Sequence, residues 1–251
     1  MNSKTIDAVF FDMDETLIEH HQTGEELIRA TFRAFAHRLE GIHEDKFATM
    51  LWHKANDLWQ MMFDGVLSGE VARPYTFINT LRAFKADDAL AHDMLEDFEQ
   101  RMVQATRLMP GALEVMDTLR DAGKVVGVVT NGYTLMQMRK VEAHLIHEHA
   151  DFVIVSEQVD SHKPHPDIFH EAVRRAGTSP ERALFVGDNL DADIAGANAV
   201  GIGTVLIDPR GERAKRIAVD EDCPRPDYVI ADLPEVLRLA GLSADVARAR
   251  S

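Results

Sequence analysis

The chain has 251 residues, of which 45% are hydrophobic and 27% charged, and these ordinary globular proportions argue against global disorder. Its formal net charge of −15 at pH 7 repels phosphate polymers, so we expect no nucleic-acid partner. Cys223 is the single cysteine and cannot form an internal disulfide, and no apolar run reaches membrane-spanning length. We therefore expect a cytoplasmic protein with no membrane partner.

Six short apolar runs rich in β-branched residues predict strands that are buried on both faces of a parallel sheet. They are Ala8–Phe11, Val125–Thr130, Phe152–Val155, Ala183–Val186, Thr204–Ile207 and Tyr228–Ile230. Helical patterns lie between them, at Ala112–Ala122, Asp167–Ala176 and Asp191–Ala199. The alternation of strand and helix from about residue 105 predicts a doubly wound, Rossmann-like α/β domain.

The segment from about residue 24 to 104 has a different pattern. Apolar residues recur at helical spacing, as at Ile28, Phe32 and Phe35, and no convincing strand is present. Gly69 and Pro74 interrupt this pattern. We predict three or four helices inserted after the first strand, with a core formed by 1–16 and 105–251 and a helical cap formed by 17–104.

Acidic residues follow the first predicted strand directly. Asp12 and Asp14 are two residues apart, so an extended backbone places both carboxylates on one face, and Thr16 follows them. Neighbouring carboxylates repel unless a cation lies between them or each has a chemical task. The alternative interpretation is a turn or helix-capping cluster, because Asp and Thr often begin helices.

Polar residues also follow the next two strands. Thr130, Asn131 and Gly132 end the second strand at a turn whose backbone N–H groups can surround a phosphate oxygen. Lys163 lies in a polar stretch after the third strand and can neutralise charge on a phosphoryl group. An ordinary helix-capping turn and a solvated lysine are the structural alternatives.

A second acidic cluster follows the fourth strand. Asp188 stands at the strand end, and Asp191 and Asp193 follow in what we predict to be the first turn of a helix. Hard oxygen ligands without a His or Cys pairing favour Mg²⁺ over zinc. Acidic residues in a first helical turn also interact with the helix dipole, so Asp191 and Asp193 need not both serve a site.

Together these four segments resemble the four motifs of the haloacid dehalogenase superfamily, in the order of that family. Asp12 to Thr16 resembles its D-x-D-x-T motif, Thr130 its hydroxyl motif and Lys163 its lysine motif. The segment from Gly187-Asp188 to Asp193 resembles its acidic motif. The helical insertion after the first motif is similar to that of the helical-cap subclass.

The resemblance implies a Mg²⁺-dependent phosphatase acting on a small phosphorylated metabolite. It assigns Asp12 as the nucleophile that forms an aspartyl-phosphate and Asp14 as the general acid and base. Mg²⁺ would be held by the Asp12 carboxylate, the Asp14 carbonyl and Asp188. Thr130, the Asn131 and Gly132 amides and Lys163 would hold the phosphoryl oxygens, and Asp193 would orient Lys163 or a metal-bound water.

Other activities within the same superfamily stay open. Carbon–halogen cleavage is disfavoured because Asp14 is present, whereas the dehalogenases of the superfamily lack this second aspartate. A phosphomutase shares the aspartyl-phosphate chemistry. A phosphonatase needs a lysine in the cap that forms a Schiff base with the substrate. Lys46 and Lys54 lie in the predicted cap, but neither is in an apolar or motif-like context that would indicate this role. A non-catalytic binding protein on this fold is a further alternative, and it would be expected to have lost motif residues that this chain retains. The Thr-Asn-Gly turn and the Gly-Asp-Asn segment of the acidic motif resemble those of members that hydrolyse nucleoside monophosphates or sugar phosphates, and this resemblance implies substrates of these types.

Overall fold

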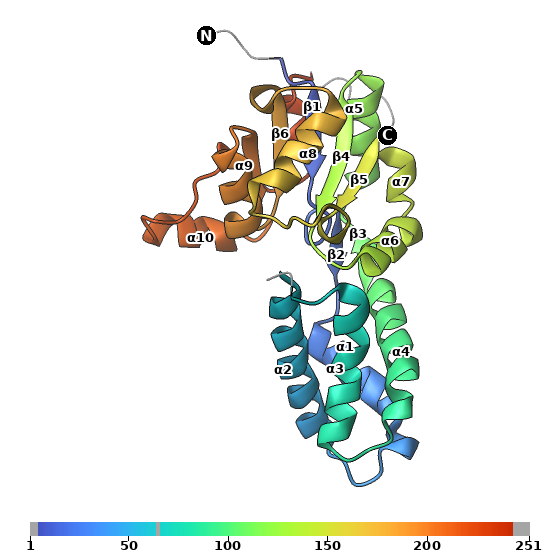
Figure 1. The fold of residues 1–251 in the computed structure, drawn as a ribbon. Helices are drawn as coiled ribbons and strands as arrows, with labels where there is room; N and C mark the ends of the chain where they lie inside the picture. The colour runs from blue at the N-terminus through green and yellow to red at the C-terminus, as the bar shows by residue number, and fades with distance from the viewer. Residues whose placement is uncertain (1–4, 64–65, 243–251) are drawn as a thin grey trace. The chain divides into compact units, whose positions relative to one another are not determined.

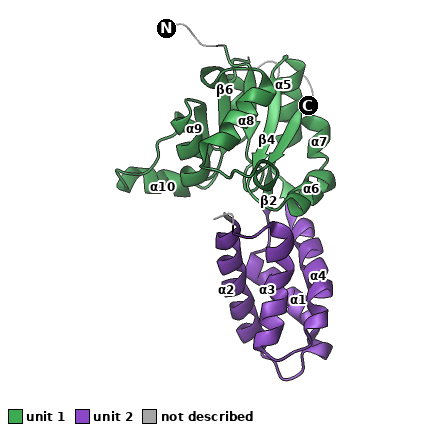
Figure 2. Cartoon of the chain, viewed as in Figure 1, with its two compact units in different colours: residues 1–19, 107–251 green, residues 20–106 purple. Residues whose placement is uncertain are grey.

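A computed structural model describes residues 5–63 and 66–242 of the chain (Figure 1). These residues separate into two compact units (Figure 2). We call residues 1–19 and 107–251 the core unit and residues 20–106 the cap unit. Within the described ranges, none of the helices combines the length and apolar character that crossing a bilayer requires.

The core unit is built on a six-stranded parallel sheet with the strand order β5-β4-β1-β6-β7-β8. Its strands are β1 (Ala8–Phe11), β4 (Val125–Thr130), β5 (Phe152–Val155), β6 (Ala183–Gly187), β7 (Gly203–Ile207) and β8 (Tyr228–Ile230). The predicted doubly wound α/β fold is confirmed, and the observed strands match the six predicted runs to within one residue. The first strand of the chain lies in the middle of the sheet, between β4 and β6.

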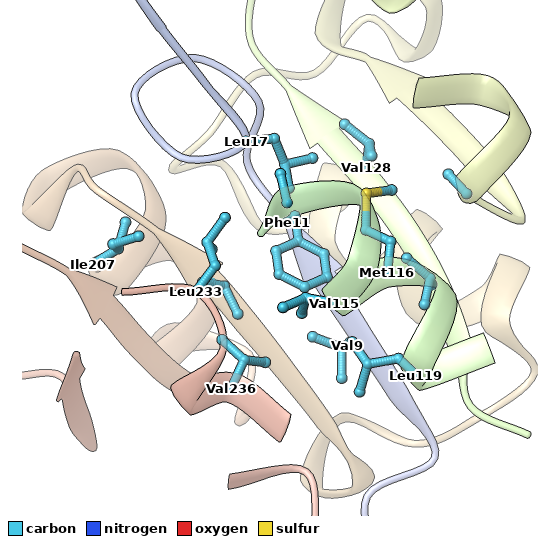
Figure 3. Packing of buried hydrophobic residues seen from close by; sticks show 14 of the residues in the cluster. Val9, Phe11, Leu17, Val115, Met116, Leu119, Val128, Ile207, Leu233 and Val236 are labelled. Atoms are coloured by element: carbon cyan, nitrogen blue, oxygen red, sulfur yellow. The ribbon is translucent and has the colours of Figure 1, made fainter. Parts of the chain in front are cut away.

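Helices cover both faces of this sheet (Figure 1). The α-helices described in the core unit are α5 (Ala112–Asp121), α6 (Thr134–Ala143), α7 (Ile146–His149), α8 (Pro166–Ala176), α9 (Ala195–Ala199), α10 (Glu212–Val219) and α11 (Glu235–Leu239). Successive residues of β1 point to opposite faces. Val9 and Phe11 pack with α5 and α11 in the cluster of Figure 3, whereas Phe10 packs with α8. Burial on both faces explains why the strands are continuously apolar.

The cap unit consists of helices, as predicted for an insertion after the first strand. They are α1 (Gly24–Ala34), α2 (Glu44–Phe63), α3 (Gly69–Ala83) and α4 (Ala91–Gln104). Thr23 and Glu26 form a reciprocal capping box that begins α1. Phe32, Phe47 and Phe77 pack in the apolar core of this unit.

A proline within the cap and two short strands at its junctions with the core unit differ from the sequence interpretation. Pro74 lies inside α3, which continues to Ala83, so the proline removes one backbone donor without ending the helix. The short strands β2 (Ile18–His20) and β3 (Thr106–Leu108) were not predicted and pair with each other. Along the chain, the boundaries between the two compact units fall at residues 19/20 and 106/107. The sequence interpretation places these boundaries at 16/17 and 104/105.

Gly127 in β4 provides a test of how tightly this sheet is packed. A Cβ atom at this position would lie 2.5 Å from the ring of Phe152. We expect Gly127→Ala to lower the free energy of unfolding by about 1–3 kcal/mol, because the partly buried Phe152 ring would have to move away from its contacts with Phe10 and Arg175. Urea denaturation measures this change.

Gly203→Ala in β7 is the matched control, since its Cβ would meet the flexible end of Leu184 at 3.0 Å. We expect a smaller loss for this variant. An equal or greater loss for Gly203→Ala would contradict the packing argument.

Candidate active site

The carboxyl ends of the central strands bring three sequence-predicted residues together. Asp12 follows β1, Thr130 ends β4 and Asp188 follows β6. The backbone N–H of Asp12 donates to the carbonyl of Val186 at 2.9 Å, which extends the β1–β6 ladder to the first aspartate. In open α/β sheets, ligands bind outside these strand ends.

Lys163 lies between two buried carboxylates. Its Nζ is 2.6 Å from Oδ1 of Asp12 and 2.7 Å from Oδ1 of Asp193, and all three side chains are at least nine-tenths buried. The second oxygen of Asp193, Oδ2, accepts a hydrogen bond from the backbone N–H of Asn189 at 3.0 Å. Within the described part of the chain, no hydrogen bond reaches Oδ2 of Asp12. The nucleophile predicted from the sequence therefore keeps one oxygen available.

The loop that carries Lys163 is fixed by the side chain of Asn131. The Asn131 amide donates to the Lys163 carbonyl at 2.9 Å and accepts from the Lys163 N–H at 2.8 Å. The ammonium also lies 5.4 Å from the ring centroid of Phe185, within the range of a cation–π interaction. Asn131 thus holds Lys163 in place, in addition to any role of its backbone amide.

Helix α6 holds Asp14 by both carboxylate oxygens. Lys140 Nζ lies 2.7 Å from Oδ1, and Gln137 Nε2 donates to Oδ2 at 2.8 Å. Gln137 Nε2 also lies 2.6 Å from Thr130 Oγ1, which links the hydroxyl at the end of β4 to Asp14. Gln137 and Lys140 are almost fully buried, so these contacts lie away from bulk water.

Gly132 has a different local role from the one that the sequence indicated. Its N–H donates to Ser156 Oγ at 3.0 Å, so this amide is already engaged within the protein. Its φ of +149° and the 2.9 Å that would separate a Cβ from Gln137 Cγ both favour glycine here. Gly132 therefore makes room for Gln137.

Asp188 is paired with an arginine that the sequence analysis did not identify. Arg213 Nη2 contacts Asp188 Oδ2, and Arg213 Nε donates to the Asp188 carbonyl at 2.8 Å. Burial, with a further contribution from Asp193, raises the pKa of Asp188 to about 6, although Arg213 acts in the opposite direction. Within the described residues, Oδ1 of Asp188 accepts no hydrogen bond.

The buried trio has strongly shifted proton affinities. Burial raises the pKa of Asp12 well above its ordinary value, and the nearby Asp193 and Asp188 add to this, while Lys163 opposes it. Burial alone would lower the pKa of Lys163, but Asp12 and Asp193 outweigh it and raise this pKa above its usual value. The lysine is therefore charged at neutral pH, and a cation beside Asp12 would favour its ionised form.

The donor set at this end of the sheet fits a hard divalent cation. Asp12, Asp188 and Asp193 each offer an oxygen, and these atoms lie within 4.8 Å of one another. Oxygen-only ligands suit Mg²⁺. Asp193 already uses its two oxygens for Lys163 and Asn189, whereas Asp12 and Asp188 each retain one. Asp191 lies outside this group and pairs with Arg216.

Three functional candidates were missed in the sequence: Gln137, Lys140 and Arg213. Each lies on a helix rather than at a strand end, so the motif pattern did not include them. Gln137 and Lys140 are three residues apart and share a face of α6. Their spacing indicates that the two side chains lie on one helix face, but only the fold shows that this face contacts Asp14.

Comparison with known proteins identifies the same family as the motifs. The sequence profile of the haloacid dehalogenase-like hydrolases matches residues 6–201. A glyceraldehyde 3-phosphate phosphatase of Methanopyrus kandleri is 32% identical over 234 residues, covering 92% of this chain and 95% of that protein. The pyrimidine 5′-nucleotidase YjjG of Escherichia coli is 26% identical and covers 93% of this chain and 97% of that protein. A ribulose-1,5-bisphosphate 5-phosphatase of Halopiger xanaduensis is 36% identical over 50% of this chain and 52% of that protein.

Solved structures share the complete fold. A 2-haloacid dehalogenase of Pseudomonas syringae has a TM-score of 0.72 at 26% identity and covers 93% of this chain and 99% of its own. A HAD-hydrolase, YfnB of Bacillus subtilis, was crystallised with magnesium and has a TM-score of 0.68 at 21% identity, covering 95% of this chain and 100% of its own. The profile match spans most of the chain, and the M. kandleri relative spans nearly all of it. The chain therefore belongs to the haloacid dehalogenase-like hydrolases, as its four motifs predicted.

Proposed function

We propose that this protein is a Mg²⁺-dependent phosphatase that hydrolyses a small phosphomonoester through an aspartyl-phosphate on Asp12. The observation that carries the proposal is the arrangement of Asp12, Lys163 and Asp193. One buried ammonium holds the first oxygen of Asp12, and the second oxygen accepts no hydrogen bond from the described residues. Phosphoryl transfer depends mainly on such positioning and charge neutralisation.

In the first step, Oδ2 of Asp12 attacks phosphorus and the bond from phosphorus to the leaving oxygen breaks. Asp14 gives that oxygen a proton. In the second step, Asp14 takes a proton from a water molecule that attacks phosphorus, and the bond between phosphorus and Asp12 breaks to release inorganic phosphate. A carboxylate nucleophile divides hydrolysis into two easier steps.

The remaining residues orient these groups. Lys163 and Thr130 would bind phosphoryl oxygens, and the Asn131 backbone amide stays a candidate for the same task. Asn131 holds the Lys163 loop through its side chain, and Asp193 orients the ammonium. The N–H of Gly132 donates to Ser156, so we do not assign it to the phosphoryl group; the contribution of Gly132 is the space that it leaves for Gln137.

Mg²⁺ would be held by the Asp12 carboxylate, the open oxygen of Asp188 and the carbonyl of Asp14. The ion would neutralise charge on the phosphoryl oxygens. The engagement of both Asp193 oxygens supports an orienting role for Asp193 over direct ligation.

The presence of Asp14 supports phosphatase over dehalogenase chemistry, since an alkoxide leaving group needs a proton and a halide does not. Its carboxylate is held by Gln137 and Lys140, which suits a group that must keep one orientation through both steps. The substrates named for the similar proteins are sugar phosphates and pyrimidine nucleotides. We propose a substrate from these two classes.

Replacing Asp12 by Asn is expected to abolish phosphate release, because an amide cannot act as the nucleophile. Release of inorganic phosphate is measured with Mg²⁺ or EDTA on glyceraldehyde 3-phosphate, ribulose 1,5-bisphosphate, pyrimidine nucleotides and phosphoglycolate. Asp167→Asn changes an exposed aspartate of α8 in the same way and is expected to retain wild-type activity. Phosphate release by Asp12→Asn at the wild-type rate would refute the mechanism. Phosphate transferred between sugar hydroxyls without release would favour the mutase.

Replacing Asp14 by Asn is expected to lower kcat by about 10²–10⁴-fold, the range for a general acid and base. The loss in the first step should be smaller for p-nitrophenyl phosphate, whose leaving group needs no proton. Rapid quench with this substrate is expected to show a nitrophenol burst followed by slow phosphate release, since the second step still needs the base. Equal losses for alkyl and nitrophenyl esters, without a burst, would count against this role.

The raised pKa of Asp188 predicts that the free energy of unfolding of the metal-free protein depends on pH. Because the folded state binds this proton more tightly than the unfolded state, the carboxyl group stabilises the fold at low pH and loses that contribution as pH rises through about 6. From pH 5 to pH 8, Asp188→Asn should therefore gain about 1–1.5 kcal/mol of unfolding free energy relative to wild type. Urea denaturation in EDTA measures the difference, and a difference independent of pH would show that the pKa of Asp188 is unshifted.

A further inference from the structure

Helix α10 presents two arginines to the acidic loop that follows β6. Arg213 and Arg216 are three residues apart, and they pair with Asp188 and Asp191, which have the same spacing. Arg213 contacts both the carboxylate and the carbonyl of Asp188. Arg216 makes two hydrogen bonds to the carboxylate of Asp191, at 2.7 and 2.9 Å.

The position of Arg213 is set by a buried helix cap. Asp208 follows β7, and its fully buried side chain accepts hydrogen bonds from the backbone N–H groups of Glu212 at 3.0 Å and Ala214 at 2.8 Å. These bonds fix the first turn of α10, in which Arg213 lies. The Arg213 side chain is three-quarters buried, so its contact with Asp188 differs from that of a solvated surface arginine.

The partner of Arg213 is also a member of the oxygen cluster formed by Asp12, Asp188 and Asp193. A divalent cation in this cluster and the guanidinium would share one carboxylate and repel each other across it. We propose that Arg213 acts as a competing cation that weakens the binding of Mg²⁺ to Asp188. This inference rests on the metal ligands assigned under the proposed function.

The same helix supplies a control for this effect. Arg216 is an arginine of α10 with a similar ion pair, but Asp191 is mostly exposed and lies outside the oxygen cluster. Loss of Arg216 removes a contact between α10 and the loop while leaving the charge beside Asp188 unchanged. A general loosening of the helix would therefore affect both variants, whereas charge competition would affect only Arg213.

The test is calorimetric titration of the substrate-free 251-residue chain with Mg²⁺ alone. We expect Arg213→Gln to bind Mg²⁺ about tenfold more tightly than wild type, equivalent to about 1.4 kcal/mol. Arg213→Lys keeps the positive charge and should stay close to wild type, as should Arg216→Gln. Asp188→Asn gives the background of Mg²⁺ bound elsewhere on this acidic chain.

Each outcome separates this inference from the proposed function. Unchanged or weaker binding by Arg213→Gln, with normal binding by wild type, would overturn the inference and leave the phosphatase intact. Equal tightening by Arg216→Gln would also overturn it. Binding by Arg213→Gln without detectable binding by wild type would support it, whereas no binding by either would overturn both assignments. Thermal unfolding in EDTA confirms that each variant is folded, and Arg213→Met replaces Arg213→Gln if that variant is not.

Discussion

The active end of the sheet depends on one buried ammonium. Lys163 lies between Asp12 and Asp193, and removal of its charge would leave two carboxylates facing each other away from water. Breaking a buried ion pair typically costs about 3–5 kcal/mol, because the remaining charge has no solvent to replace its partner. The same arrangement that reduces the repulsion within the acidic pair also leaves one oxygen of Asp12 available for chemistry. Stability and reactivity at this site therefore share a single cation.

Several details of the surrounding chain serve to keep this ammonium in place. Asn131 binds the backbone of Lys163 on both sides of the residue, and the backbone N–H of Asn189 fixes the far oxygen of Asp193. Gly187 has no side chain, and a Cβ there would collide with the Asp193 carboxylate. A glycine at the end of β6 is thus required by the close approach of a charged group.

The sequence was sufficient to predict the sheet because each strand is buried on both faces and is bounded by polar residues. It also predicted which strand ends carry acidic or basic side chains, and the structure brings Asp12, Lys163, Asp188 and Asp193 together. The two-stranded β2–β3 pair could not be predicted, because neither three-residue strand has a periodic pattern. Arg213 could not be predicted for a different reason: its partner Asp188 lies 25 residues earlier in the chain, before helix α9 and strand β7. Local sequence patterns indicate which residues lie at the end of a strand, but they do not indicate which helix face will contact those residues in the fold.

The central position of β1 also constrains the order in which this site can form. Ala8 pairs with Val125 on one side and Ala183 on the other, so the earliest strand of the chain is completed by two much later ones. Contacts between residues so distant in sequence form slowly, since long loops must close first. During synthesis, Asp12 emerges long before Lys163 and Asp193, and its local environment is completed only after β6 has left the ribosome. Until Lys163 and Asp193 have been synthesised, Asp12 of the nascent chain therefore lacks the two charged partners that surround it in the folded protein.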